Sequence, residues 1–293
     1  MPLRDVLLAC VVALLWGFNF VVMKAGVTEV EPMLLLALRF GLAAFPILFF
    51  VARPAVSWGL LATFAAAFAV VKFGFLFVAL KLGMPSGLAS LVLQVHAFFT
   101  VLLAALMLSE RPTRQQIAGL TVAFTGLAAI GAGEAGSVTL VPFLMVIAAA
   151  ASWAVANITV KRAGAVDMLG FTVWGSALAT PMLIVASLIL EGPARMGASL
   201  GNPSWTAIGA TLYLAYPVTI IGVVLWNDLL KRHRAASIAP FALLVPVVGL
   251  VSSHLVYGEP FSGLRLWGGL LIGAGLLINS VPEWWVRRSS HAV

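Results

Sequence analysis

One sequence pattern occurs twice in this chain, and both copies lie in strongly apolar surroundings. The segment WGFNFVVMK at residues 16–24 recurs as WAVANITVK at 153–161, and ERPTRQQIAG at 110–119 recurs as EPFSGLRLWG at 259–268. A duplicated membrane unit with an odd number of spans places its two copies in opposite orientations. Such inverted repeats are typical of solute carriers, whose site faces either side of the membrane in turn. The repeat therefore predicts two related halves, residues 1–137 and 138–293.

The composition predicts an integral membrane protein. Hydrophobic residues make up 62% of the 293 residues and charged residues 9%, with a mean hydropathy of +1.10. A soluble domain carries about 25% charged residues. The single cysteine, Cys10, excludes an internal disulfide or a cysteine-based metal site. The net charge of +7 is spread singly over short loops, so we interpret it as a topology signal and expect no nucleic acid partner.

Ten apolar segments are long enough to cross a bilayer as helices, since about 20 residues suffice. They lie at about 5–26, 33–52, 58–80, 84–108, 114–133, 139–160, 167–190, 205–229, 236–257 and 263–282. No segment alternates with period two, which argues against a β-barrel. The first segment has a counterpart in mid-chain and no clear cleavage site, so we interpret it as a retained span and not a signal peptide. The predicted fold is all-α, with ten transmembrane helices in two inverted five-helix repeats.

Positive charge predicts the orientation of these spans. With the N-terminus in the cytoplasm, inner loops and tails carry eleven Lys or Arg residues, whereas outer loops carry only Lys24, Lys81, Arg195 and Arg265. Positively charged loops stay inside. Both chain ends are therefore expected in the cytoplasm.

Prolines and glycines mark positions where helices bend or approach closely. Pro46 in the first half matches Pro181 in the second, and proline kinks a helix. We predict hinges at Pro46, Pro181, Pro217, Pro240 and Pro246, although membrane helices tolerate proline for other reasons. Small residues at 119, 126, 268, 269, 273 and 275 favour close helix packing within one bundle over dimerisation, so we expect a functional monomer.

These motifs together resemble the EamA-type exporters of the drug/metabolite transporter superfamily. The resemblance rests on WGxNF at 16–20, LRF at 38–40, GMPSGLASLV at 83–92, ER at 110–111, AP at 239–240, LVPV at 244–247 and EP at 259–260. It implies a multi-pass protein of the bacterial inner membrane that exports amino acids, of the aromatic or the cysteine type. The chain departs from many relatives in having Gln94-Val95-His96 where they place a proline.

Polar residues within the spans are the candidates for substrate contact, because a charge in the membrane is costly. Lys72 lies near the middle of the third span, where its ammonium could meet a substrate carboxylate, bind a backbone carbonyl or reach the surface. Arg39 lies near the outer end of its span, where we expect a structural clamp. His96 can donate, accept or titrate near neutral pH, although a core histidine is the plain alternative. The predicted substrate-binding or gating residues are Lys72, Gln94, His96, Trp16, Asn19, Trp153, Asn157, Tyr213, Tyr216, Phe73, Phe77 and Trp174.

The tryptophan and asparagine residues of this group were chosen for their spacing along a helix. Asn19 and Asn157 each lie one helical turn from a tryptophan, Trp16 and Trp153, so each half is expected to present the same pair to a shared cavity. All ten acidic residues fall in loops or near span ends, which argues against a pump for cations.

A membrane protein of this kind can be an exporter of amino acids, a carrier of other solutes or an intramembrane enzyme. Export of aromatic and other neutral amino acids with broad specificity by alternating access fits an aromatic cavity with a few amide and cationic groups. The alternative is an exporter of drugs or other small metabolites. An intramembrane enzyme would need a nucleophile with its base or a metal cluster within the spans, and no such motif is present. We therefore expect a transporter with a small-molecule substrate, no cofactor and no metal.

Overall fold

The computed structural model describes residues 1–109, 112–133, 139–233, 238, 241–260 and 263–280, and this part of the chain is helical without strands. The all-α prediction is confirmed. The helices are α1 (Leu3–Glu29), α2 (Pro32–Ala44), η1 (Ile47–Phe49), α3 (Trp58–Phe64), η2 (Ala65–Lys72), α4 (Phe73–Lys81), α5 (Ser86–Val92), η3 (Leu93–Val95), α6 (His96–Leu108), α7 (Arg114–Gly133), α8 (Leu140–Ala163), α9 (Met168–Leu190), α10 (Pro193–Gly201), α11 (Trp205–Tyr213), η4 (Leu214–Ile221), α12 (Gly222–Arg232), α14 (Leu244–Tyr257) and α15 (Gly263–Ser280).

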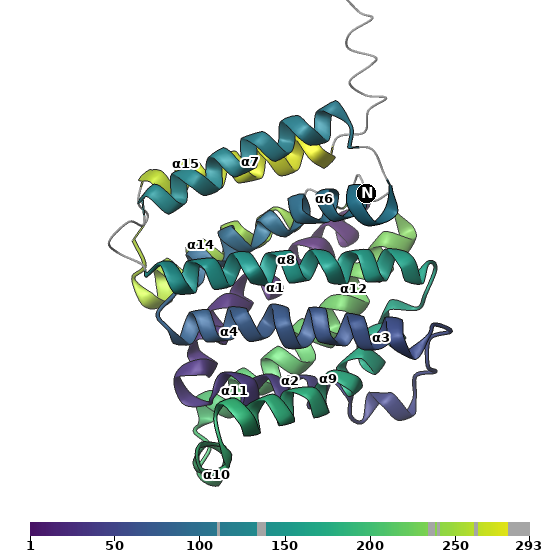
Figure 1. Cartoon of the computed structure of the whole chain (residues 1–293), viewed down its shortest axis with the longest axis vertical. Helices are drawn as coiled ribbons and strands as arrows, with labels where there is room; N and C mark the ends of the chain where they lie inside the picture. Colours follow the sequence, from purple (N-terminus) through teal and green to yellow (C-terminus); the bar gives the residue numbers. More distant parts are fainter. Residues whose placement is uncertain (110–111, 134–138, 234–237, 239–240, 261–262, 281–293) are drawn as a thin grey trace, which may run out of the picture.

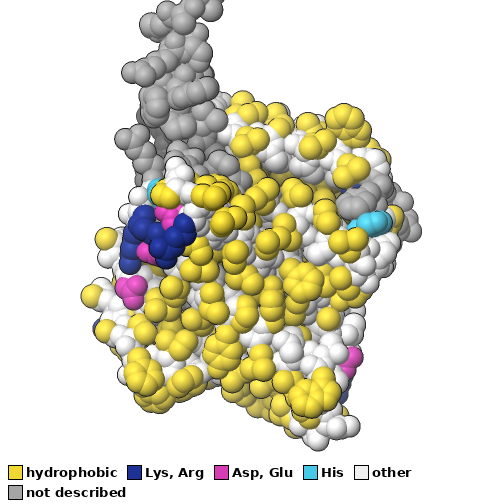
Figure 2. All heavy atoms as spheres, turned by 180° about the vertical axis from the view of Figure 1, so that it is seen from behind, with side chains coloured by type: hydrophobic (Ala, Val, Ile, Leu, Met, Phe, Trp, Pro, Cys, Tyr) yellow, Lys and Arg dark blue, Asp and Glu magenta, His cyan; other side chains and the backbone are white. Residues whose placement is uncertain are grey.

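Seven helical segments of the described chain are long and apolar enough to cross a membrane. They are Leu3–Glu29, Pro32–Phe49, Trp58–Lys81, Ser86–Leu108, Leu140–Ala163, Met168–Leu190 and Trp205–Arg232. Three more helices, α7, α14 and α15, fall where the other spans were predicted, and α14 and α15 are shorter apolar helices. The protein is thus a multi-pass membrane protein, while the count of ten spans stays a prediction. Figure 2 shows hydrophobic side chains across the broad middle of one face, as lipid contact requires.

Helices α7 and α15 pack against each other along their length at one side of the molecule (Figure 1). Their contact is made by glycines. A Cβ on Gly126 would lie 2.6 Å from the carbonyl oxygen of Gly268, and one on Gly275 would lie 2.5 Å from that of Gly119. These four glycines therefore pack within the bundle, as predicted. Gly273 differs, because nothing lies within 4 Å of a Cβ placed there.

The main core lies among α1, α2, α4, α5 and α8. Its largest fully buried side chains include Phe40 and Phe77, and Phe73 packs against both, with ring centroids 5.7 and 6.1 Å away. Aromatic pairs at such separations stabilise a core beyond their buried area. This packing fixes the helices that carry the polar residues described below.

Two π-helical segments interrupt long helices at corresponding places in the repeated sequence. Both η2 and η4 have eight residues, and η4 begins 149 positions after η2, the same shift that relates Glu110 to Glu259. A π-helical turn often occurs at functional sites. Lys72 ends η2, and Pro217 lies inside η4.

The predicted hinge prolines have different local structures. Pro46 lies in the turn between α2 and η1, so the helix ends there, whereas its counterpart Pro181 lies inside α9, which continues past it. Pro246 lies in the first turn of α14, and Pro240 lies outside the described residues. The short helix α10 was not predicted. It occupies the polar stretch between the seventh and eighth spans and begins with a proline at its first position, where proline is well tolerated.

Candidate functional site

Lys72 lies in an aromatic box within the bundle. Only 4% of Lys72 is exposed. Its Nζ lies 3.5 Å from the ring centroid of Trp153, 4.1 Å from that of Phe73 and 4.3 Å from that of Phe68. A buried ammonium over aromatic faces gains cation–π stabilisation. The side chain does not reach the surface, and it hydrogen-bonds no carbonyl of the described chain, so two of the three predicted roles for Lys72 are wrong.

His96 contacts the same Trp153 ring as Lys72 does. It begins α6, and its imidazole stands perpendicular to the indole, with ring centroids 3.6 Å apart. Its Nδ1 is buried and has no hydrogen-bond partner among the described residues. Gln94 is half-buried two positions earlier, in the 3₁₀ turn η3 that separates α5 from α6. Thus Lys72 and His96, predicted separately, meet at one tryptophan.

Arg39 belongs to the same cluster, which the sequence analysis did not predict. Only 2% of the residue is exposed, and its guanidinium carbon lies 4.2 Å from the ring centroid of Phe73. Its Nε donates to Thr219 Oγ1 at 3.2 Å, so it joins α2 to η4. Its Nη1 is buried without a hydrogen-bond partner in the described structure. Arg39 therefore links two helices, as a structural clamp would, while its depth in the membrane stays a prediction.

The two predicted tryptophan–asparagine pairs do not make equivalent contacts. Trp16 donates from Nε1 to the carbonyl oxygen of Val218 in η4 at 3.2 Å, while Trp153 contacts Lys72 and His96. Asn157 donates to Thr100 Oγ1 at 3.0 Å. The repeat thus predicts matching positions, but their neighbours differ.

Asn19 is the more deeply buried of the two amides, and its hydrogen bonding is the less complete. Its Nδ2 lies 3.7 Å from the sulfur of Met23, and its buried Oδ1 has no partner among the described residues.

The remaining predicted aromatic residues lie in other parts of the bundle. Tyr213 donates its hydroxyl to the carbonyl oxygen of Leu15 at 3.0 Å, and Tyr216 is half-buried in η4. Trp174 donates to the carbonyl oxygen of Val51 at 3.1 Å, in the connection that follows η1. Phe77 is fully buried in the core. Of the predicted residues, the structure therefore brings together Lys72, His96, Trp153 and Phe73.

Ionic contacts join the two ends of α1 to the second half of the chain. Near one end, Glu259 Oε1 accepts from Lys24 Nζ at 2.9 Å and from the backbone N–H of Ser86 at 2.8 Å, and its Oε2 accepts from the N–H of Gly87 at 3.0 Å. Carboxylates are favourable at a helix N-terminus, here that of α5.

At the other end of α1, Asp5 contacts Arg232 Nη1 at 2.8 Å and His233 Nε2 at 2.6 Å. Two separate ionic contacts therefore close opposite ends of one helix against its neighbours.

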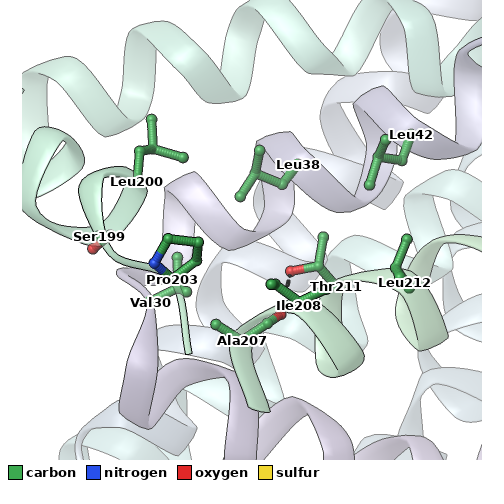
Figure 3. Close-up of a pocket in the computed structure, with 10 residues that line it drawn as sticks. All are labelled: Val30, Leu38, Leu42, Ser199, Leu200, Pro203, Ala207, Ile208, Thr211 and Leu212. Carbon is green, nitrogen blue, oxygen red and sulfur yellow. Dashed lines mark hydrogen bonds between the residues drawn. The ribbon is translucent and has the colours of Figure 1, made fainter. Parts of the chain in front are cut away.

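Figure 3 shows a pocket between α2, α10 and α11 that differs in kind from the cluster. Nearly all of its lining is apolar. The hydroxyl of Thr211 donates to the carbonyl oxygen of Ala207 at 2.7 Å, so it offers little to a ligand. The pocket shares no lining residue with the cluster around Trp153. It therefore lacks the charged groups that a polar solute would need.

Comparisons with known proteins agree with this architecture. The model of the EamA-like transporter family matches residues 3–132 and 140–281. A protein of Salmonella typhimurium named "Probable amino-acid metabolite efflux pump" is 43% identical over 99% of both chains, and one of the same name from Escherichia coli is 41% identical over 95% of both.

Two further matches are more distant. A "Probable terminal-alkyne amino-acid exporter" of Streptantibioticus cattleyicolor is 32% identical over 66% of this chain and 64% of its own. A solved crystal structure covers 94% of this chain and 96% of its own with a TM-score of 0.61, and its 22% identity shows a shared fold alone. The chain is a transporter and not an enzyme, and it belongs to the EamA-like family of the drug/metabolite transporter superfamily.

Proposed function

We propose that this protein exports amino acids and closely related metabolites, aromatic and other neutral ones among them, across the bacterial inner membrane by alternating access. The observation that carries the proposal is the aromatic box around Lys72. This box offers a substrate carboxylate an ammonium, and it offers an apolar side chain the rings of Phe68, Phe73 and Trp153. The names of the relatives support the same substrate class.

The unbalanced positive charge of Lys72 is the reason to expect an anionic ligand in the aromatic box. Lys72 is buried, and it forms no ion pair with any carboxylate that the structure describes. A buried charge without a counter-ion is costly, and in membrane proteins it marks a substrate or ion path. Cation–π contacts offset only part of that cost, on the order of 2 kcal/mol for a desolvated pair. A substrate carboxylate would supply the missing charge.

The proposed motion uses the two halves, residues 1–137 and 138–293, in inverted orientation with both chain ends in the cytoplasm. The ionic contacts of Lys24 and Asp5 lie at opposite ends of α1, about 19 residues apart and hence about 28 Å along the helix. Opening either side requires one contact to separate while the other holds. The matched π-helical segments η2 and η4, together with the prolines, would take up the bending. One chain suffices, so the functional unit is a monomer.

Reconstitution in liposomes tests this proposal. Vesicles loaded with an unlabelled solute are diluted into the labelled form, and counterflow is followed for phenylalanine, tryptophan, leucine, cysteine and O-acetylserine, with and without a pH gradient. We expect saturable uptake of at least the aromatic members. Uptake of lipophilic drugs or of unrelated metabolites, with none of the amino-acid compounds transported, would refute the substrate class and favour the alternative exporter.

A further inference from the structure

We infer that Arg39 and Lys72 form one dicationic centre that prefers amino-acid-derived carboxylates without a free ammonium group, such as 2-hydroxy, 2-oxo and N-acyl acids, to the zwitterionic amino acids that the same site carries. The inference rests on the proposed export function and specifies the substrate class of the same site. It was not predicted from the sequence, in which Arg39 and Lys72 lie on separate spans and were given different roles.

The two cations converge on one ring. The guanidinium carbon of Arg39 lies 4.2 Å from the ring centroid of Phe73, and Lys72 Nζ lies 4.1 Å from the same centroid. The distance between the two charges therefore cannot exceed the sum of these two distances. Arg39 is 2% exposed and Lys72 4% exposed, so water does not screen the pair. Two like charges that are buried this close repel each other and favour an anion between or beside them.

An acceptor is missing at this centre. Arginine has five N–H donors, and Arg39 uses Nε for Thr219 while its buried Nη1 has no partner among the described residues. Buried polar groups in proteins are partnered in about 90% of cases or more, so an orphaned guanidinium nitrogen calls for an explanation. A carboxylate fits it well, because its two oxygens match the planar fork of the guanidinium.

No carboxylate of the described residues pairs with this centre, so a substrate ammonium group would find no counter-ion there. The described carboxylates that form ion pairs do so elsewhere, as Asp5 and Glu259 do at the ends of α1, and none pairs with Arg39 or Lys72. A zwitterionic amino acid carries its ammonium next to its carboxylate, so capture of the carboxylate would bring that ammonium toward two cations. Replacing it by a hydroxyl, a ketone oxygen or an amide keeps the shape and removes the repulsion. Discrimination by an unfavourable charge is a common route to specificity.

Phenylalanine and 3-phenyllactate test this inference as a matched pair, because they differ chiefly in an ammonium against a hydroxyl. Counterflow of each labelled compound is measured in proteoliposomes at pH 7.5, with protein-free vesicles subtracted for passive leakage. We expect kcat/KM for phenyllactate to exceed that for phenylalanine about tenfold, the factor that corresponds to one charge contact of modest strength. Phenylalaninamide, which keeps the ammonium and lacks the carboxylate, should not be transported.

Variants then assign the preference to the two cations. Arg39→Gln should bring the two rates close to parity, Arg39→Lys should keep the preference, and Arg53→Gln, which changes an exposed arginine, should leave it intact. If Arg39→Gln does not fold, Lys72→Gln replaces it with the same expected loss of preference. The ratio of the two rates is the readout, because a merely structural clamp would lower both rates alike.

The outcomes separate the two claims. Transport of phenylalanine as fast as phenyllactate, or faster, would overturn the inference and leave the export function intact. An equal loss of both rates in Arg39→Gln would also overturn it and assign Arg39 to packing alone. If wild-type protein transports neither these compounds nor any other amino-acid compound, the proposed function itself fails.

Discussion

The contact between Glu259 and the start of α5 predicts how easily one side of the transporter opens. Glu259 Oε1 accepts from Lys24 and from Ser86, and Oε2 accepts from the backbone N–H of Gly87. In Glu259→Gln, an amide nitrogen replaces one oxygen and one donor loses its acceptor, while the charge attraction to Lys24 disappears.

The magnitude follows from these bonds. A hydrogen bond to a charged group contributes about 1.5–3 kcal/mol. The Glu259 side chain is 11% exposed and that of Lys24 is 23% exposed, so solvent screening reduces the ion-pair part. We take about 2 kcal/mol as the net loss, which corresponds to about a thirtyfold increase in the fraction of open molecules, since 1.4 kcal/mol is tenfold.

A single cysteine reports this opening. Ser253 is fully buried, and its Oγ lies 2.8 Å from that of Ser86, so Ser253→Cys on a Cys10→Ser background should react with a maleimide only when this end opens. Glu259→Gln should accelerate labelling about thirtyfold at low reagent concentration. The control is Glu29→Gln, which neutralises an exposed acid at the end of the same α1 helix. Labelling rates that agree within about twofold for the two variants would refute the gating role of Glu259.

Two further predictions concern stability. Asp5→Asn should lower the melting temperature, because the bonds to Arg232 and His233 lose their charge, whereas Asp228→Asn at a more exposed side chain should lower it less. Melting in detergent measures both, and equal melting temperatures would contradict the asymmetry. Gly126→Ala should destabilise the packing of α7 on α15 by about 1–3 kcal/mol, since its Cβ would meet backbone atoms, while Gly273→Ala faces open space and should be neutral. A tolerated Gly126→Ala would show that the two helices can move apart.

The helices were predictable because hydrophobicity alone specifies them. A run of about 20 apolar residues forms a helix in a membrane whatever its neighbours, since backbone groups there must bond within the segment. Lys72, a cation near the middle of such a run, was predicted as a site residue for the same reason. The close packing at the glycines of α7 and α15 was equally predictable, because small residues on one helix face indicate a close neighbour.

The contacts between helices were not predictable in the same way. Periodicity shows which residues share a face of one helix, but it does not show which helix lies opposite. The sequence therefore separated Arg39 from Lys72, although both contact Phe73, and it treated Trp16 and Trp153 as equivalent, although only Trp153 contacts Lys72. The role of Glu259 at the N-terminus of α5 depends on the same tertiary information.

The most direct test of the substrate site is a binding measurement on Lys72. Lys72→Met keeps the length and apolar volume of the side chain and removes its charge, and Lys81→Met does the same at an exposed position. Isothermal titration of the purified proteins with the best-transported substrate of the wild type should show affinity reduced at least about tenfold in Lys72→Met, since a charge-assisted contact of at least 1.4 kcal/mol is lost, and unchanged affinity in Lys81→Met. Wild-type affinity in Lys72→Met would contradict the placement of the substrate at this cluster.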